Sequence, residues 1–459
     1  MRLRNRTLIA GSWTVLGYGA DLFFRLTSNL ILTRLLFPEA FGAVAAASAL
    51  ITGLSLVSDF GVAQIIIQSP RGDQVDFLRS AWVFLLCRSM ALWAIVLSLC
   101  GLLSISAIRK LFPDSSIYAD PSFAFVTGSL GLCMVLGSAE STAQFLNIRQ
   151  LNYKPTIIIQ LASRLLTLPL MIMWAWIAPS VWALVAGAVA GAILRLILSH
   201  TIVPGPWMSL KWNPDYLQEI VRTGRWFTLS SFGTFLSQQG DVILLGFWVP
   251  SSLLGVYSVA KLLIGVGEGL LDRLNSSLTL PVLSEILRKN ASKFRTQYYS
   301  FRLPIEIAAG LLSGSLFAAG HFVVGFLYDT RYAEAGMMLS ILALSTAVYP
   351  YLIIRSAFAV TADTHIFAAI SILQATSLIA FVAIGFFALG LEGAVWGVAL
   401  HRTIPALLTA LLARKRDWIV VWREFSIIPA FLVGFLMGKG LMLGATAIGL
   451  TNVHQLFHH

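Results

Sequence analysis

Apolar stretches long enough to cross a lipid bilayer recur along the whole of this 459-residue chain. A spanning helix needs roughly 20 apolar residues. Hydrophobic residues make up 57% of the chain and charged residues only 12%, whereas soluble domains carry roughly 25% charged residues. A chain this apolar cannot present a polar surface to water. We therefore predict a polytopic membrane protein of the all-α class.

The apolar stretches predict twelve spanning helices. A thirteenth stretch, Phe425–Leu450, is either one more span or a short re-entrant hairpin, and we favour one span. The predicted helices are Leu8–Leu36, Phe41–Ile67, Ala81–Ile108, Phe123–Leu146, Thr156–Ile177, Val181–Ile202, Trp226–Val249, Leu253–Leu280, Leu303–Leu327, Gly336–Val360, Ile366–Leu389 and Gly393–Leu412.

The distribution of Lys and Arg predicts the orientation, because cytoplasmic loops carry an excess of both. With the N-terminus inside, the outside connections hold only Arg109, Lys110 and Arg331. The net charge of +11 then belongs to cytoplasmic loops facing anionic lipid, and we expect no nucleic-acid partner. The segment Met1–Arg6 resembles the start of a signal peptide, but no cleavage site follows, so we expect an uncleaved first helix.

The helices group into two sets of six around a basic connection. We predict an N-terminal six-helix bundle at 1–203, a cytoplasmic linker at 204–225 and a C-terminal six-helix bundle at 226–413. A basic cytoplasmic segment and the extra apolar stretch follow at 414–459. Within the linker, Asn213 can cap a helix that has Pro214 at its first position. We expect this helix to be amphipathic and to lie on the inner membrane surface.

The two predicted bundles repeat each other weakly. Asn29 stands nine positions before Pro38, and Asp241 stands nine positions before Pro250, with an apolar run between in each case. The spacing of about 212 residues also superimposes the second and eighth helices. Internal repeats in a membrane protein point to transport, because two halves can move about a site between them.

Polar residues form a stripe on one face of four predicted helices. Such residues are costly inside a bilayer and usually face an interior. We therefore predict a hydrated cavity lined by the first, second, seventh and eighth helices. The stripes are Tyr18, Asp21, Arg25 and Asn29; Ser48, Thr52, Ser55 and Asp59; Ser230, Thr234, Ser237, Gln238 and Asp241; and Lys261, Gly265, Glu268 and Asp272.

Two cations lie deep in these helices. Arg25 is near mid-bilayer, about 25 Å along its helix, and Lys261 is roughly 12 Å below the outer end of its own. Such cations attract an anion, and Arg binds phosphate especially well. The substrate-binding candidates are Arg25, Lys261, Asn29, Ser237, Gln238 and Arg355, and the candidates for ion coupling or charge balance are Asp21, Asp59, Asp241, Glu268 and Asp272.

Structural roles compete with each of these assignments. Asp21 and Arg25, four residues apart, can neutralise each other, and Lys261 can pair with Glu268. Asp59 and Asp272 can cap helix ends or pair with Arg71, Arg79 or Arg273. Arg195 and Arg402 lie close enough to helix ends to extend to the inner surface. No catalytic residue, cofactor or metal site is expected, since His321 and His401 stand alone and Cys87, Cys100 and Cys133 are scattered.

Three segments resemble bacterial polysaccharide transporters. They are Thr33-Arg-Leu-Leu-Phe-Pro-Glu-Ala-Phe-Gly42, Leu56-Val-Ser-Asp-Phe-Gly-Val-Ala-Gln-Ile-Ile-Ile-Gln68 and Phe227-Thr-Leu-Ser-Ser-Phe-Gly-Thr-Phe-Leu-Ser-Gln-Gln-Gly-Asp-Val-Ile-Leu-Leu-Gly246. Those proteins are the O-antigen and lipid-linked oligosaccharide flippases of the multidrug/oligosaccharidyl-lipid/polysaccharide exporter superfamily. The resemblance implies two pseudo-symmetric six-helix bundles around a central cavity. The extra stretch after Leu412 departs from the plain twelve-helix form.

The resemblance also implies a function in lipopolysaccharide or exopolysaccharide biosynthesis. We expect a non-enzymatic flippase of the bacterial inner membrane that moves undecaprenyl-diphosphate-linked oligosaccharide outward by alternating access. Its coupling is to H⁺, to Na⁺ or to the membrane potential, and its partners are membrane lipids, a polysaccharide polymerase and glycosyltransferases. One alternative is a multidrug or cation antiporter of the same superfamily. The other is a membrane glycosyltransferase or polymerase, for which the longest outside loop, Arg109–Ser122, is too short.

Overall fold

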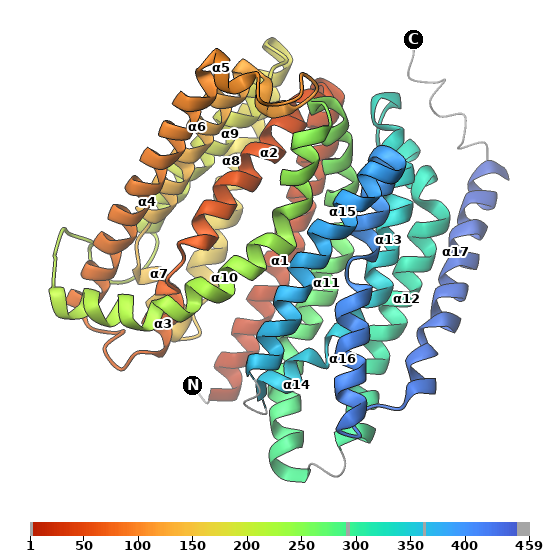
Figure 1. Cartoon of the computed structure of the whole chain (residues 1–459). Helices are drawn as coiled ribbons and strands as arrows, with labels where there is room; N and C mark the ends of the chain where they lie inside the picture. Colours follow the sequence, from red (N-terminus) through yellow and green to blue (C-terminus); the bar gives the residue numbers. More distant parts are fainter. Residues whose placement is uncertain (1–2, 291–293, 361–363, 448–459) are drawn as a thin grey trace. The chain divides into compact units, whose positions relative to one another are not determined.

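The chain folds into helices joined by short connections. The computed structural model describes residues 3–290, 294–360 and 364–447, with the backbone alone given for a few stretches inside these ranges, and it contains no strand in them. Ten helical segments of this described part are long and apolar enough to cross a membrane. The predicted all-α, polytopic class is confirmed (Figure 1).

The chain divides into two compact units, and each is described by itself. Unit 1 comprises Met1–Phe235 and Gly246–Leu254, and unit 2 comprises Leu236–Leu245 and Gly255–His459. The division therefore falls inside two long helices. The boundaries that we predict for the bundles at 1–203 and 226–413 stay predictions.

Unit 1 is built around a small set of packed helices. Helix α8 packs against α1 and α9, and α6 packs against α2, α4 and α9. Leu36 and Ala183 are fully buried where α1, α2, α8 and α9 meet. The elements are α1 (Leu3–Leu35), α2 (Pro38–Val57), α3 (Val62–Gln68), α4 (Val75–Ser104), α5 (Ser106–Arg109), η1 (Ile117–Ala119), α6 (Pro121–Ser138), α7 (Ala143–Arg149), α8 (Lys154–Ile177), α9 (Val181–Thr201) and the first part of α10 (Pro214–Trp248).

Unit 2 is organised around α12 and α13. Helix α12 packs against α13 and α17, while α13 also contacts α15 and α16. Its core includes Tyr298 and Phe358, both fully buried. The elements are α11 (Ser251–Asn290), α12 (Phe294–Leu327), η3 (Thr330–Tyr332), α13 (Glu334–Leu352), α14 (Arg355–Val360), α15 (Thr364–Leu400), α16 (Thr403–Lys415), η4 (Val421–Phe425) and α17 (Ile427–Ala447).

Four of the predicted spans are interrupted, and the one predicted at Ala81–Ile108 breaks after Ser104. The span predicted at Phe41–Ile67 breaks between α2 and α3, where Gly61 has the left-handed φ of 61° that favours glycine. The Oδ1 atom of Asp59 accepts a hydrogen bond from the Gly61 N–H at 2.9 Å, which stabilises the break. The spans predicted at Phe123–Leu146 and Gly336–Val360 likewise end early, at Ser138 and Leu352. Apolar composition alone did not reveal these breaks.

The boundary predicted between Leu389 and Gly393 is confirmed. The chain turns at Leu389 and Gly390, where the backbone leaves helical geometry inside α15. The two arms then approach very closely, since a Cβ on Gly385 would stand 2.0 Å from the carbonyl oxygen of Gly393. Only glycine permits this approach.

The apolar stretch near the C-terminus forms one helix within the described residues. Helix α17 runs from Ile427 to Ala447, as the single-span interpretation predicts; residues 448–450 of the predicted span lie outside the described ones. Helices α12 and α17 pack through reciprocal glycines. A Cβ on Gly314 would stand 2.1 Å from the Phe431 carbonyl oxygen, and one on Gly434 would stand 2.4 Å from that of Leu311.

The predicted surface helix is not a separate element. Asn213 caps the helix as expected, because its side chain accepts a hydrogen bond from the Asp215 N–H at 3.0 Å. The helix then continues as α10 to Trp248 without a break, since no residue between 222 and 226 stops it. Its first turns are held by α3 and α4: Tyr216 packs edge-on against Phe77 with ring centroids 5.4 Å apart.

Helices α1 and α10 are less apolar than the other predicted spans. Both have ample length, at 33 and 35 residues. Within the residues that the structure describes in full, neither contributes a segment long and apolar enough to count as a span. These two helices carry polar stripes that we predict from the sequence, and those stripes lower their hydropathy.

Candidate functional site

The polar stripe on α1 contains one carboxylate that forms an ion pair and one cation that does not. Asp21 of α1 forms an ion pair with Arg164 of α8, the helix that packs against it. The alternative in which Asp21 neutralises Arg25 is therefore wrong, since the opposing helix supplies the partner. Within the part of the chain that the structure describes, Arg25 has no ion pair, and its Nε atom is buried without a hydrogen-bond acceptor.

Asp59 has a structural role. Its carboxylate lies 3.5 Å from the Arg88 guanidinium of α4, and it also holds the break between α2 and α3. Arg88 in turn donates to the Ser58 carbonyl oxygen at 3.1 Å. Arg71 is engaged elsewhere, 3.4 Å from Glu219, so the predicted pairing of Asp59 with Arg71 is wrong.

A second interhelical pair in unit 1 joins α9 to the end of α6. Arg195 lies 3.3 Å from Glu140, whose carboxylate also accepts a hydrogen bond from Gln144 at 3.0 Å. We expected Arg195 to extend to the inner surface. That prediction is wrong, because a carboxylate within reach offers the guanidinium a charge-assisted hydrogen bond.

Asp241 and Lys261 form the central ion pair of unit 2. The Lys261 ammonium donates to the Asp241 carboxylate at 2.7 Å and to the Gln238 carbonyl oxygen at 2.8 Å. Tyr257 also donates to Asp241, which is almost fully buried. The alternative pairing of Lys261 with Glu268 is wrong. The Lys261 side chain nevertheless remains 32% exposed, enough for it to reach a second partner.

Glu268 pairs with Arg402 instead. The two nitrogens of the guanidinium lie 2.6 and 3.2 Å from the two carboxylate oxygens, a bidentate arrangement. Ser345 donates a further hydrogen bond to Glu268 at 2.9 Å. Arg402 therefore does not extend to the membrane surface as we expected. The three residues join α11, α13 and the start of α16.

The remaining charged candidates have neutral partners. Tyr349 donates a hydrogen bond to Asp272 at 2.6 Å. Arg355 donates to the amide oxygen of Gln374 at 2.9 Å, and its guanidinium lies 5.2 Å from the centre of the Phe367 ring. Among the described residues, no carboxylate forms an ion pair with Arg355.

Two polar candidates are placed without a defined role. Asn29 lies on α1 one turn beyond Arg25, and Ser237 lies on α10 one turn before Asp241. Both make further contacts within the protein. Their contact with a substrate stays a prediction.

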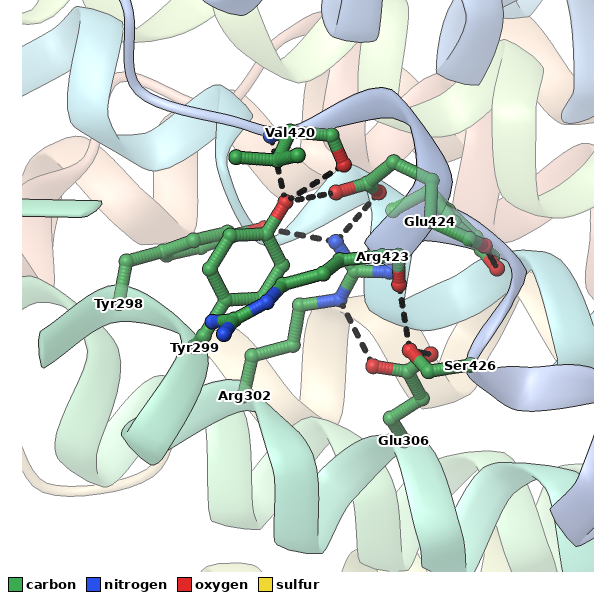
Figure 2. Close-up of polar contacts among 9 residues, drawn as sticks. Tyr298, Tyr299, Arg302, Glu306, Val420, Arg423, Glu424 and Ser426 are labelled. Atoms are coloured by element: carbon green, nitrogen blue, oxygen red, sulfur yellow. Dashed lines mark hydrogen bonds and ion pairs between the residues drawn. The ribbon is translucent and has the colours of Figure 1, made fainter. Parts of the chain in front are cut away.

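The most buried charge among the described side chains of unit 2 was missed by our sequence analysis. Arg302 of α12 is 1% exposed and lies between two carboxylates, 3.3 Å from Glu306 and 2.5 Å from Glu424 (Figure 2). Its guanidinium also lies 4.4 Å from the centre of the Tyr351 ring. The i, i+4 spacing of Arg302 and Glu306 was the available signal, but nothing in the sequence identifies Glu424, 122 residues later, as a partner.

The surrounding hydroxyl groups complete this cluster. Tyr299 donates to Glu424 at 2.6 Å and accepts from the Val420 N–H at 2.9 Å. Ser426 donates to Glu306 at 2.6 Å. Figure 2 shows that these groups tie α12 to the segment preceding α17. With its cation between two carboxylates, the cluster holds the segment before the C-terminal helix against α12.

Pairing leaves an uneven balance of charge. Five carboxylates that face neighbouring helices each pair with one Arg or Lys in the described structure, namely Asp21, Asp59, Glu140, Asp241 and Glu268. Arg25 and Arg355 have no carboxylate partner in that same described part. Unpaired cations in an apolar protein attract anions, and a guanidinium suits phosphate. The arrangement defines an all-helical, multi-pass membrane protein in which Arg25 and Arg355 are cations without an ion pair among the described residues.

The family follows from sequence comparison. A family model described as "polysaccharide biosynthesis protein" matches residues 31–337, about two thirds of the chain. The chain belongs to this family, which confirms the resemblance that the sequence motifs indicate. The chain is also 20% identical over 343 residues to the succinoglycan biosynthesis transport protein ExoT of Rhizobium meliloti (strain 1021). That alignment covers 73% of this chain and 65% of the relative's length, just under two thirds.

Solved structures share the fold. A structure of the lipid II flippase MurJ in an inward closed conformation matches with a TM-score of 0.64 and 14% identity, covering 96% of this chain and all of that one. An inward-facing multidrug resistance transporter of the MATE family, from the MOP superfamily, matches with a TM-score of 0.57 and 16% identity over 86% of this chain and 94% of its own. At these identities the similarity establishes the fold alone.

Proposed function

We propose that this protein is a flippase for a lipid-linked polysaccharide precursor. The substrate is an oligosaccharide carried on undecaprenyl diphosphate, and the mechanism is alternating access. The family, the transport protein among its relatives and the fold of a lipid flippase support this assignment. A membrane glycosyltransferase or polymerase has no such support, because these relatives are transporters.

The unpaired Arg25 is the observation that carries the choice of substrate. A cation in a membrane helix is costly unless it is paired, and such residues mark substrate paths. Asp21, the nearest carboxylate on the same face of α1, is engaged by Arg164. Arg25 thus remains available to the diphosphate of the substrate. Lys261 is a second candidate, which would release Asp241 when it binds a phosphate oxygen.

The antiporter alternative is disfavoured by the same charges. A transporter for cationic drugs needs a carboxylate that can bind the drug. Five carboxylates are already neutralised by Arg or Lys within the described structure, and Asp272 accepts a hydrogen bond from Tyr349. An anionic substrate is therefore better matched. We further infer that the protein works in a bacterial inner membrane beside the polymerase and glycosyltransferases that use the same lipid carrier.

Polysaccharide export in the native host tests this function. Deletion of the gene should abolish the exported polymer, and its lipid-linked precursor should accumulate on the inner side of the membrane. Wild-type protein should restore export. Arg25→Glu should not restore polysaccharide export even when the protein is as abundant as the wild type. Arg25→Lys should retain part of the export activity because the positive charge remains. Lys439→Gln, a change of charge in α17, serves as the control and should export normally. Full export with Arg25→Glu would contradict the role of this residue, and an unaltered polymer in the deletion strain would contradict the function.

A further inference from the structure

Unit 1 carries an apolar groove that the proposed transport site does not use. Its volume is about 880 Å³, and it lies among α4, α6, α8 and α9. The walls include Leu97 and Phe125, with Trp93, Trp174 and Trp182 around them. The indole of Trp93 donates its N–H to the Gly128 carbonyl oxygen at 3.0 Å, so this wall is fixed.

Small residues hollow out the groove between these large side chains. Gly101, Ala124 and Ala186 stand among its lining residues. A Cβ placed on Gly101 would meet no other atom within 4 Å, so the space beside it is open. A larger side chain at residue 101 would therefore enter the groove without disturbing the packing of the helices.

The groove extends over the depth of one leaflet. On α4 it is lined from Trp93 to Ser104, the last twelve residues of that helix. At 1.5 Å per residue this is roughly 17 Å, close to half of the ~30 Å hydrocarbon core. The lining residues of α6 and α9 come from the matching ends of those helices. An apolar groove of this depth suits one hydrocarbon chain that starts at a membrane surface.

Two cations follow the end of α4 that lines the groove. Arg109 and Lys110 come five and six residues after Ser104, the lining residue nearest to that end of α4. Lys110 is exposed, and the Nε atom of Arg109 is buried without a hydrogen-bond acceptor among the described residues. A phosphate at this position would have two cationic partners.

We propose that this groove binds one anionic glycerophospholipid. One acyl chain lies along Leu97, Gly101 and Phe125, and the phosphate is held by Arg109 and Lys110. The match of the groove to a single leaflet favours an ordinary acyl chain over the much longer isoprenoid chain of a polysaccharide carrier. The inference stands on the geometry of unit 1 and does not require the transport function.

Native mass spectrometry of the purified protein tests the site. The protein in detergent is titrated with phosphatidylglycerol or with phosphatidylcholine, and the bound lipid is counted. Gly101→Leu fills the groove and should weaken retention of phosphatidylglycerol roughly tenfold. Gly440→Leu is the matched control, because Gly440 is also an open glycine of a spanning helix, far along the sequence in α17. It should bind as the wild type does.

Charge and lipid specificity are tested separately. The double variant Arg109→Gln, Lys110→Gln should bind phosphatidylglycerol about as weakly as phosphatidylcholine. This double variant and Gly101→Leu should both keep the melting temperature of the wild type. Equal retention by Gly101→Leu and Gly440→Leu would overturn the proposal. So would undecaprenyl phosphate displacing phosphatidylglycerol at a lower concentration, because the groove would then belong to the carrier lipid.

Discussion

At the scale of single residues, the deep charges of this protein are mostly matched across helices. Asp21 takes its partner from α8 and Glu268 takes its partner from α16, each from another helix of the same unit. A buried charge that loses its partner is strongly destabilising, whereas removing both partners is often neutral. This asymmetry makes the pairs testable without any assay of transport.

The Asp241–Lys261 pair gives the clearest prediction of this kind. Lys261→Met should lower the unfolding free energy by about 1–3 kcal/mol, because Asp241 stays buried with only Tyr257 and backbone groups to satisfy it. The double variant Asp241→Asn, Lys261→Met should recover much of this loss. The measurement is the melting temperature of the purified protein in detergent. Additive losses in the double variant would show that the two residues do not stabilise each other.

The sequence predicts which residues carry charge inside the membrane, but not how they pair. The spacing of Asp21 and Arg25 suggests a pair on one helix, whereas the actual partner, Arg164, lies more than a hundred residues away. Arg302 and Glu424 illustrate the same limit. Partner choice depends on which helices pack together, and that information is not present in the periodicity of any one helix.

At the scale of helices, glycine determines where the chain breaks and how closely it packs. Apolar runs predict the helices well, because each must be buried in lipid or in protein. They do not predict the breaks at Asp59–Gly61 and after Ser138, where a few polar residues interrupt runs that continue as apolar beyond them. The polar residues Asp59 and Asn213 are the local signals, and both are predicted as possible caps, but Asp59 is placed near the end of one long span and not at a break inside it.

The packing of α12 against α17 provides a prediction at this scale. Gly314→Leu should destabilise the protein by several kcal/mol or prevent its accumulation, since even a Cβ there would stand 2.1 Å from the Phe431 carbonyl oxygen. Gly444→Leu, at an open position of α17, should be tolerated. Protein abundance and melting temperature in detergent are the measurements. If both variants had the same abundance and melting temperature, the close contact between α12 and α17 would not be needed for the stability of the protein.

At the scale of the whole molecule, the charges of the connections predict the orientation in the membrane. Arg109, Lys110 and Arg331 are expected outside and the other basic connections inside. Exposed residues on either side of α4 make this measurable: Asp73 precedes the helix and Ser115 follows it. The native Cys87, Cys100 and Cys133 must first be replaced.

Thiol labelling of intact cells then distinguishes the two orientations. A membrane-impermeant maleimide should label Ser115→Cys directly and Asp73→Cys only after the membrane is permeabilised. The opposite pattern would place the N-terminus outside. Labelling of both positions in intact cells would show that α4 does not separate them.

The central claim is that the protein moves a diphosphate-linked lipid and that Arg25 engages its charge. The most direct measurement is translocation in vesicles that contain the purified protein and a fluorescent undecaprenyl-diphosphate oligosaccharide, followed by quenching from one side. The account predicts rapid loss of protected fluorescence with the wild type, little with Arg25→Gln and a partial rate with Arg25→Lys. Equal rates for the wild type and Arg25→Gln, or no translocation by correctly folded wild type, would contradict it.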